Sequence, residues 1–97
     1  MNKEQYFLNQ LSEEAKEVGL VCSKIMRFGL DSNNNGQLPE TNQEQLFREL
    51  NDFLATIELL NEQCHLNFKP DQVAIATKKE KVLKHKEISK KLGLTHD

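Results

Sequence analysis

Four acidic residues form two pairs of equal spacing, and this arrangement suits the binding of metal ions. Glu14 and Glu17 are three residues apart, and Glu49 and Asp52 repeat that separation. Residues three apart on a helix share a face. Carboxylates brought together resist ionisation unless cations occupy the site, and Mg²⁺ is usually bound through a few carboxylates, water and phosphate oxygens. Solvated helices also carry such pairs, so spacing alone leaves a metal site and ordinary surface charge both open.

The segment GLDSNNNGQLPETNQE has the spacing of the first half of a calcium-binding loop. Asp31, Asn33, Asn35 and Gly36 match the first, third, fifth and sixth positions of the EF-hand pattern. The twelfth position must supply a bidentate glutamate, but here it is Asn42. We therefore interpret the segment as a connector between two helices.

Three segments have the apolar periodicity of amphipathic helices, and none alternates like a strand. The first is expected at residues 3–28, with Gly29 as its C-terminal cap. The second begins after Thr41, which has capping-box spacing to Glu44, and ends at residue 64. The third is expected at about 71–92, with Pro70 suited to its first turn. The expected core stripes of the first two helices are Phe7, Leu11, Ala15, Val18, Cys22, Ile25, Leu46, Leu50, Phe53, Ile57, Leu60 and Cys64.

The pattern predicts one all-α domain over residues 1–97, an amphipathic bundle of three main helices. Its boundaries are a connector at 30–41, an interhelix turn at 65–70 and a tail at 94–97. A chain of 97 residues buries only a modest core, so we expect oligomerisation to complete it. The two cysteines fall on apolar stripes and are expected to be reduced core residues. Without a signal peptide or a transmembrane run, the protein is expected to be cytoplasmic, with no membrane partner.

The net charge of −2 conceals a strong asymmetry along the chain. Residues 1–64 carry 5 Lys/Arg and 11 Asp/Glu, a balance of −6, whereas residues 65–97 carry 8 and 4, a balance of +4. The acidic portion argues against a nucleic-acid polymer as partner. The combination suits divalent cations that bridge to a small polyphosphate.

In this order, these residues resemble a known family. The stretches LSEEAKEVGLVCSKIMRFGL and TNQEQLFRELNDFLATIELL, separated by a polar connector, are similar to the all-α nucleoside triphosphate pyrophosphohydrolases, the MazG-like superfamily. Their signature is ExxE on one helix and ExxD on the next, here Glu14-x-x-Glu17 and Glu49-x-x-Asp52. The resemblance covers residues 5–64 and extends more loosely to KKEKVLKHKEISKKLGL. The connector is longer than the family pattern because of DSNNNG.

The resemblance implies Mg²⁺-dependent cleavage of a (deoxy)nucleoside triphosphate between its α- and β-phosphates, releasing the monophosphate and pyrophosphate in nucleotide-pool housekeeping. By that analogy all four carboxylates hold Mg²⁺, or Mn²⁺ as a substitute, and Glu17 and Glu49 are the candidate catalytic residues. A homodimer or homotetramer is also implied. The candidate substrate-binding residues are Lys24, Arg27, Asn42, Lys78 and Lys81.

Each candidate substrate-binding residue also has an ordinary structural interpretation. Lys24 lies two turns after Glu17 on nearly the same face, where its ammonium group could meet a phosphate or remain solvated. Asn42 could contact a nucleotide or belong to the first turn of the helix. Solvation is the better interpretation for any single lysine of the third helix. The main alternative for the whole chain is a non-catalytic helical module that binds nucleotides or assembles with other proteins.

Overall fold

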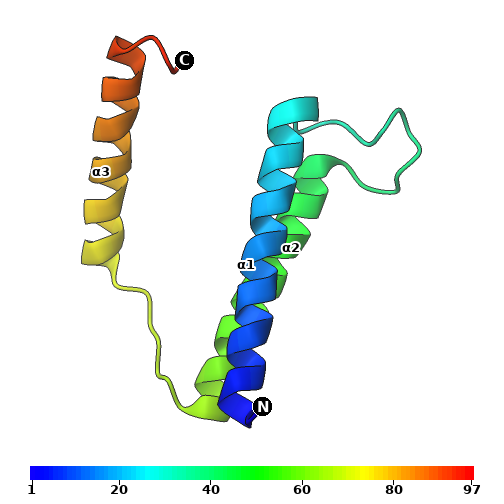
Figure 1. Ribbon diagram of the computed structural model, residues 1–97, viewed down its shortest axis with the longest axis vertical. Helices are drawn as coiled ribbons and strands as arrows, with labels where there is room; N and C mark the ends of the chain where they lie inside the picture. The colour runs from blue at the N-terminus through cyan, green and yellow to red at the C-terminus, as the bar shows by residue number, and fades with distance from the viewer.

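The computed structural model describes all 97 residues and contains three helices and no strand (Figure 1). They are α1 (Lys3–Phe28), α2 (Asn42–Cys64) and α3 (Gln72–Lys91). The α1 and α2 helices lie side by side and antiparallel as a hairpin, and α3 contacts neither of them. The all-α fold class is therefore confirmed, with helix boundaries within a residue or so of those predicted.

Local signals define both helices of the hairpin. The N-cap of α1 is Asn2, which forms a reciprocal capping box with Gln5, and Gly29 caps its C-terminus at φ +89°. A side chain would be strained at that φ, so glycine suits the position. In α2, Thr41 and Glu44 form the predicted capping box. These bonds satisfy amide groups that a helix terminus leaves without a partner.

The connector joins the start of α2 to the end of α1. The first two amides of α2 donate to connector carbonyls, Asn42 N to Ser32 O and Gln43 N to Leu30 O, each at 2.9 Å. The side-chain amide of Asn42 donates to the carbonyl of Gly29 at 2.9 Å. These bonds fix how α2 begins beside the end of α1, and so set the register of the hairpin.

The line of α2 that faces α1 is unusually polar. Its buried residues are Asn42, Glu49, Thr56 and Leu60, and the first three follow one another at steps of seven, two helical turns. The hydroxyl of Thr56 donates to the carbonyl of Asp52 at 3.0 Å. No buried side-chain polar atom lacks a hydrogen-bond partner, so these polar groups are buried without leaving a hydrogen bond unmade.

The predicted apolar stripes are not the buried core of a single chain. Of the large apolar residues, only Val21 and Leu60 are buried, and Leu50 is 40% exposed. The stripes run along one side of the hairpin, and no element of the same chain covers it. The prediction that Cys22 is a core residue is wrong, since this thiol is exposed, whereas Cys64 is half-buried.

The third helix is bounded by its own caps and stands apart. Its N-cap is Asp71, whose carboxylate accepts from the amides of Val73 and Ala74, so Pro70 precedes the cap instead of lying in the first turn as predicted. No residue of α3 is buried. No helix of the structure is long and apolar enough to cross a membrane.

Candidate metal and nucleotide site

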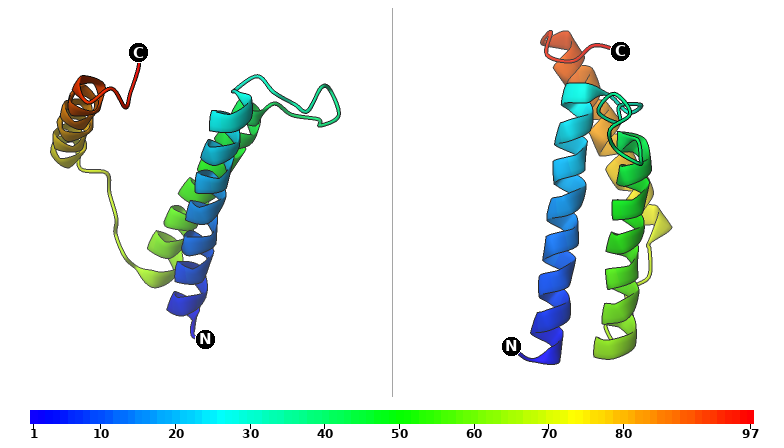
Figure 2. Two further views of the ribbon diagram at one scale, coloured as in Figure 1. Left: turned by 45° about the horizontal axis from the view of Figure 1, so that its top comes forward. Right: turned by 90° about the vertical axis from the view of Figure 1, so that its right-hand side faces the viewer.

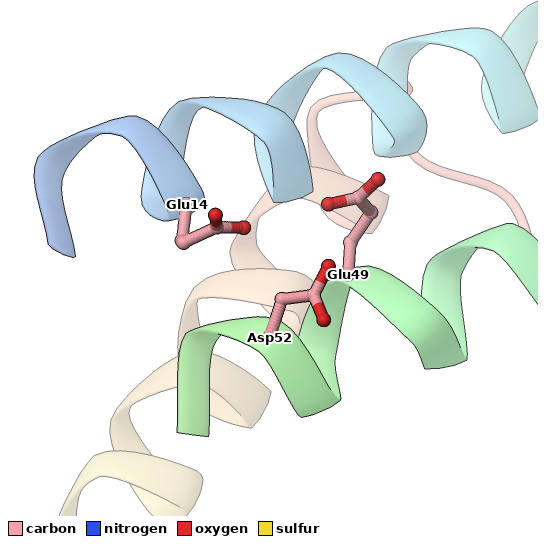
Figure 3. A group of neighbouring side chains, drawn as sticks. All are labelled: Glu14, Glu49 and Asp52. Carbon is pink, nitrogen blue, oxygen red and sulfur yellow. The ribbon is translucent and has the colours of Figure 1, made fainter. Parts of the chain in front are cut away.

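Three of the four predicted carboxylates meet between α1 and α2. Glu14 of α1 and Glu49 and Asp52 of α2 each offer an oxygen, and these oxygens lie within 4.8 Å of one another (Figure 3). The antiparallel packing brings the middle of α1 against the middle of α2, so residues 35 and more apart in sequence become neighbours. Glu49 is buried, whereas Glu14 and Asp52 are half-buried. A cation could therefore reach the group from the side of Glu14 and Asp52.

The group carries a strong excess of negative charge. Partial desolvation raises the pKa of Glu14, and the charges of Asp52 and Glu49 raise it further. The remaining contributions come from Glu17 and Glu13. Three oxygens at this separation form the type of donor set that Mg²⁺ prefers, so the residues present fit that ion.

Arg48 holds one oxygen of the buried carboxylate. Its guanidinium Nη1 lies 3.1 Å from Glu49 Oε1, and its Nη2 donates to Glu40 Oε1 at 2.8 Å. The hydrogen bond from Arg48 lowers the pKa of Glu40. Arg48 therefore bridges the last residues of the connector to the carboxylate group and fixes the orientation of Glu49.

Glu17 lies outside the group of three. It is exposed, one turn further along α1 than Glu14, and it makes no hydrogen bond or ion pair. Its charge still contributes to the raised pKa of Glu14, so it lies within electrostatic reach of the group. Its predicted roles as metal ligand and catalytic residue remain predictions.

A hollow lined mostly by polar residues, the polar hollow, lies at the connector end of the hairpin, where its residue Asn42 is two turns of α2 from Glu49. Two of the predicted substrate-binding residues, Lys24 and Asn42, line it, but both side chains are already bonded within the chain. Lys24 Nζ donates to Gln45 Oε1 at 2.6 Å, and the Asn42 amide is bonded to Gly29. The other residues that line the hollow are Phe28, Ser32, Asn34 and Leu38.

The remaining predicted substrate-binding residues lie away from the carboxylates. The guanidinium of Arg27 lies over the ring of Phe28, 5.5 Å from its centroid, at the edge of the hollow. Lys78 and Lys81 are on α3, which does not contact the hairpin of the same chain. Within one chain these two lysines therefore do not reach the acidic group.

Sequence reasoning missed the residues that support the site. Arg48 directly precedes Glu49, and its ion pair with Glu40 spans eight residues across the start of α2, a spacing that no helical rule indicates. The bond between Lys24 and Gln45 crosses from one helix to the other. Only the register of the hairpin determines these partners.

No protein family, curated protein or solved structure matches this chain in the comparisons made with known proteins.

Proposed function

We propose that this protein is a Mg²⁺-dependent nucleoside triphosphate pyrophosphohydrolase that cleaves (deoxy)nucleotides between the α- and β-phosphates. The observation that carries the proposal is the meeting of Glu14, Glu49 and Asp52 across two helices. A bound Mg²⁺ supplies positive charge for phosphate oxygens and polarises water. Water adds to phosphorus, the bridging P–O bond breaks, and the nucleoside monophosphate and pyrophosphate leave.

The four acidic residues take different roles in this proposal. Glu14, Glu49 and Asp52 hold the ion, and Arg48 keeps one oxygen of Glu49 in place. Glu17 has no partner in the chain and is exposed, so its carboxylate is the one free to accept a proton from the attacking water. Glu49, which is already held by Arg48, orients that water.

The polar hollow accommodates the rest of the nucleotide. Phe28 is 64% exposed and lines the hollow, where its ring offers a surface on which a base can stack. Lys24 has a flexible ammonium group that can exchange Gln45 for a phosphate oxygen. Asn42 is committed to Gly29, so we assign it to shaping the hollow.

The proposal includes a homo-oligomer and a cytoplasmic role in nucleotide-pool housekeeping, without a nucleic-acid polymer as partner. Large apolar residues along one side of the hairpin remain exposed in the single chain, and a second subunit would cover them. Mn²⁺ is expected to substitute for Mg²⁺, since both are bound by carboxylate oxygens.

The test is a panel of nucleoside and deoxynucleoside triphosphates with Mg²⁺, assayed for both monophosphate and pyrophosphate. Asp52→Asn should abolish turnover and keep its helical circular dichroism spectrum. Glu58→Gln, an exposed change on the same helix, should leave turnover unchanged. An inert wild-type protein, or a fully active Asp52→Asn variant, would refute the enzymatic assignment. Nucleotide binding without pyrophosphate release would instead support the non-catalytic binding module.

A further inference from the structure

One side of the hairpin is a continuous apolar face, defined here by residues from both helices. Leu11 and Ala15 are one turn apart on α1, and Phe53 and Ile57 are one turn apart on α2, so the two hollows that they line adjoin. The apolar face consists of Leu8, Leu11, Ala15, Val18, Leu50, Phe53 and Ile57. A contiguous exposed patch of this kind is typical of an interaction surface.

The linker, residues 65–71, is bonded to the end of α2 on the side of the apolar face, and α3 follows it without contacting the hairpin. Asn61 Nδ2 donates to the carbonyl of Phe68 at 2.9 Å, and Asn61 Oδ1 accepts from the amide of Phe68 at 2.8 Å. Leu66 and Phe68 line the same hollow as Leu11. Figure 2 shows α3 displaced to one side of the plane of the hairpin. The Cα radius of gyration is 17.1 Å, whereas a compact chain of this length has about 12–13 Å.

The α3 helix has its own uncovered patch and an excess of unpaired lysines. Ile75, Val82 and Leu83 are 38%, 51% and 60% exposed and lie together with two lysines. Asp97 pairs with Lys86 and Lys90. The other five lysines of α3 make no ion pair: Lys78, Lys79, Lys81, Lys84 and Lys91.

The carboxylates of the hairpin and the lysines of α3 make no ion pair with one another within the chain. In Figure 3, α3 lies behind the two helices between which the carboxylates meet. Residues 1–64 have a balance of −6 and residues 65–97 one of +4. The hairpin of a second copy would fit between the apolar face and α3 of the first. Its own apolar face would then lie against the apolar face of the first copy, and its carboxylates would face the α3 of the first copy.

We propose that a second copy of the chain occupies the space between the hairpin and α3, with apolar face against apolar face. Each α3 then lies over the carboxylate-bearing side of its partner's hairpin. Such a two-fold arrangement is self-complementary, because each copy gives and receives the same contacts. The candidate site becomes a shared one, with acidic groups from one chain and lysines from the other.

The lysines acquire a function in this assembly that they lack in the isolated chain. Lys78 and Lys81 would lie near Glu14, Glu49 and Asp52 of the partner, where they offset repulsion among the carboxylates. That they also bind the phosphates of a nucleotide rests on the proposed function. The exchange of α3 helices, in which each α3 lies over the hairpin of the other copy, does not rest on the proposed function. It follows from the apolar face, the linker and the charges.

The decisive experiment is zero-length cross-linking of lysines to carboxylates in a mixture of ¹⁴N- and ¹⁵N-labelled full-length chains, unfolded and refolded together. Exchange predicts cross-links from the lysines of α3 to Glu14, Glu17, Glu49 or Asp52 that include mixed-isotope peptide pairs. Pairs of a single isotope composition only would mean that α3 folds onto its own hairpin. That result would overturn the proposal, as would a dimer without such cross-links, or a monomer.

Phe53→Glu tests the apolar face separately. It should shift the sedimentation coefficient from that of a dimer to that of a monomer, with the helical spectrum retained. Met26→Glu is the control, since Met26 is 80% exposed and lines neither hollow of the apolar face, and it should remain dimeric. If Phe53→Glu and Met26→Glu were both dimeric or both monomeric, the proposed interface would be refuted. An inert protein with mixed-isotope cross-links would refute the enzymatic function alone, and an active monomer would refute the exchange alone.

Discussion

The hairpin and α3 differ in how their helices are stabilised, although both are long and well capped. The hairpin has buried residues and hydrogen bonds that cross between elements, such as Lys24 to Gln45 and Asn42 to Gly29. The α3 helix has a good N-cap in Asp71 but no buried residue and no contact with another helix. Caps and propensity decide where a helix begins and ends, whereas tertiary packing provides most of its stability.

The largest expected difference between the two regions is in the cost of removing an apolar side chain. Leu60 is 3% exposed in the hairpin, so Leu60→Ala should lower the free energy of unfolding by about 2–5 kcal/mol. Val82 is 51% exposed on α3. In chains diluted to monomer, Val82→Ala should change the free energy of unfolding by less than about 0.5 kcal/mol. Urea titrations followed by circular dichroism measure both. Equal losses in dilute solution would show that α3 packs on its own hairpin.

The sequence predicts the helices well because their signals are local. The capping box of Thr41 and Glu44 and the C-terminal Gly29 are short-range patterns, and each was found at the expected place. The two acidic pairs also predict that all four carboxylates meet once the helices pack antiparallel. Glu14, Glu49 and Asp52 do meet, whereas Glu17 lies outside their group.

The sequence does not predict which face of each helix is buried. An apolar stripe indicates a face that will be covered, but it does not say whether the same chain covers it. Here α1 and α2 meet along the line of Asn42, Glu49 and Thr56, whereas Leu50 and Phe53 lie to one side. The role of Arg48 depends on the same register, since its partner Glu40 precedes the helix.

The second prediction tests the hydrogen bond that joins the end of α1 to the start of α2. Asn42 is 3% exposed and its amide is bonded to the Gly29 carbonyl. Asn42→Ala should therefore cost about 0.5–1.5 kcal/mol of unfolding free energy, because it removes the part-buried hydrogen bond to the Gly29 carbonyl. Its exposed neighbour provides the control Gln43→Ala. A stable Asn42→Ala protein with a raised KM for nucleotide would reassign the amide from structure to substrate binding.

The third prediction concerns the repulsion inside the acidic group. Because the pKa of Glu14 is raised from 4.5, the folded state binds more protons than the unfolded state above that pH. The stability contributed by this residue therefore falls as pH rises through the interval between 4.5 and the raised pKa. With metal chelated, Glu14→Gln should be more stable than wild type at pH 7.

Magnesium should reverse this order of stability, so that wild type becomes more stable than Glu14→Gln. An ion that binds only the folded state stabilises it by mass action, so Mg²⁺ should raise the melting temperature of wild type more than that of Glu14→Gln. Glu62→Gln is the control, an exposed change on α2 outside the acidic group. A Glu14→Gln variant that is less stable than wild type without metal would contradict the predicted repulsion.

The smallest expected effects come from ion pairs near the surface, one in the hairpin and two in the region of α3, and they differ in kind. Arg48 lowers the pKa of Glu40, and Lys90 and Lys86 lower that of Asp97. For a carboxylate with a lowered pKa, the stabilisation is present above its unfolded pKa and is lost as pH falls through its folded pKa. Glu40→Gln should therefore weaken the cooperative unfolding of the hairpin slightly at pH 7 and make the acid limb of its stability profile shallower.

Asp97→Asn should act on α3 alone. Because α3 has no contact with the hairpin of its own chain, loss of the pairs with Lys86 and Lys90 should increase amide hydrogen exchange only in the last turns of α3. The exchange rates in α1 and α2 should not change in chains diluted to monomer. Faster exchange in the hairpin would mean that the two regions open as one cooperative unit, and α3 would then have to be packed against the hairpin in the single chain.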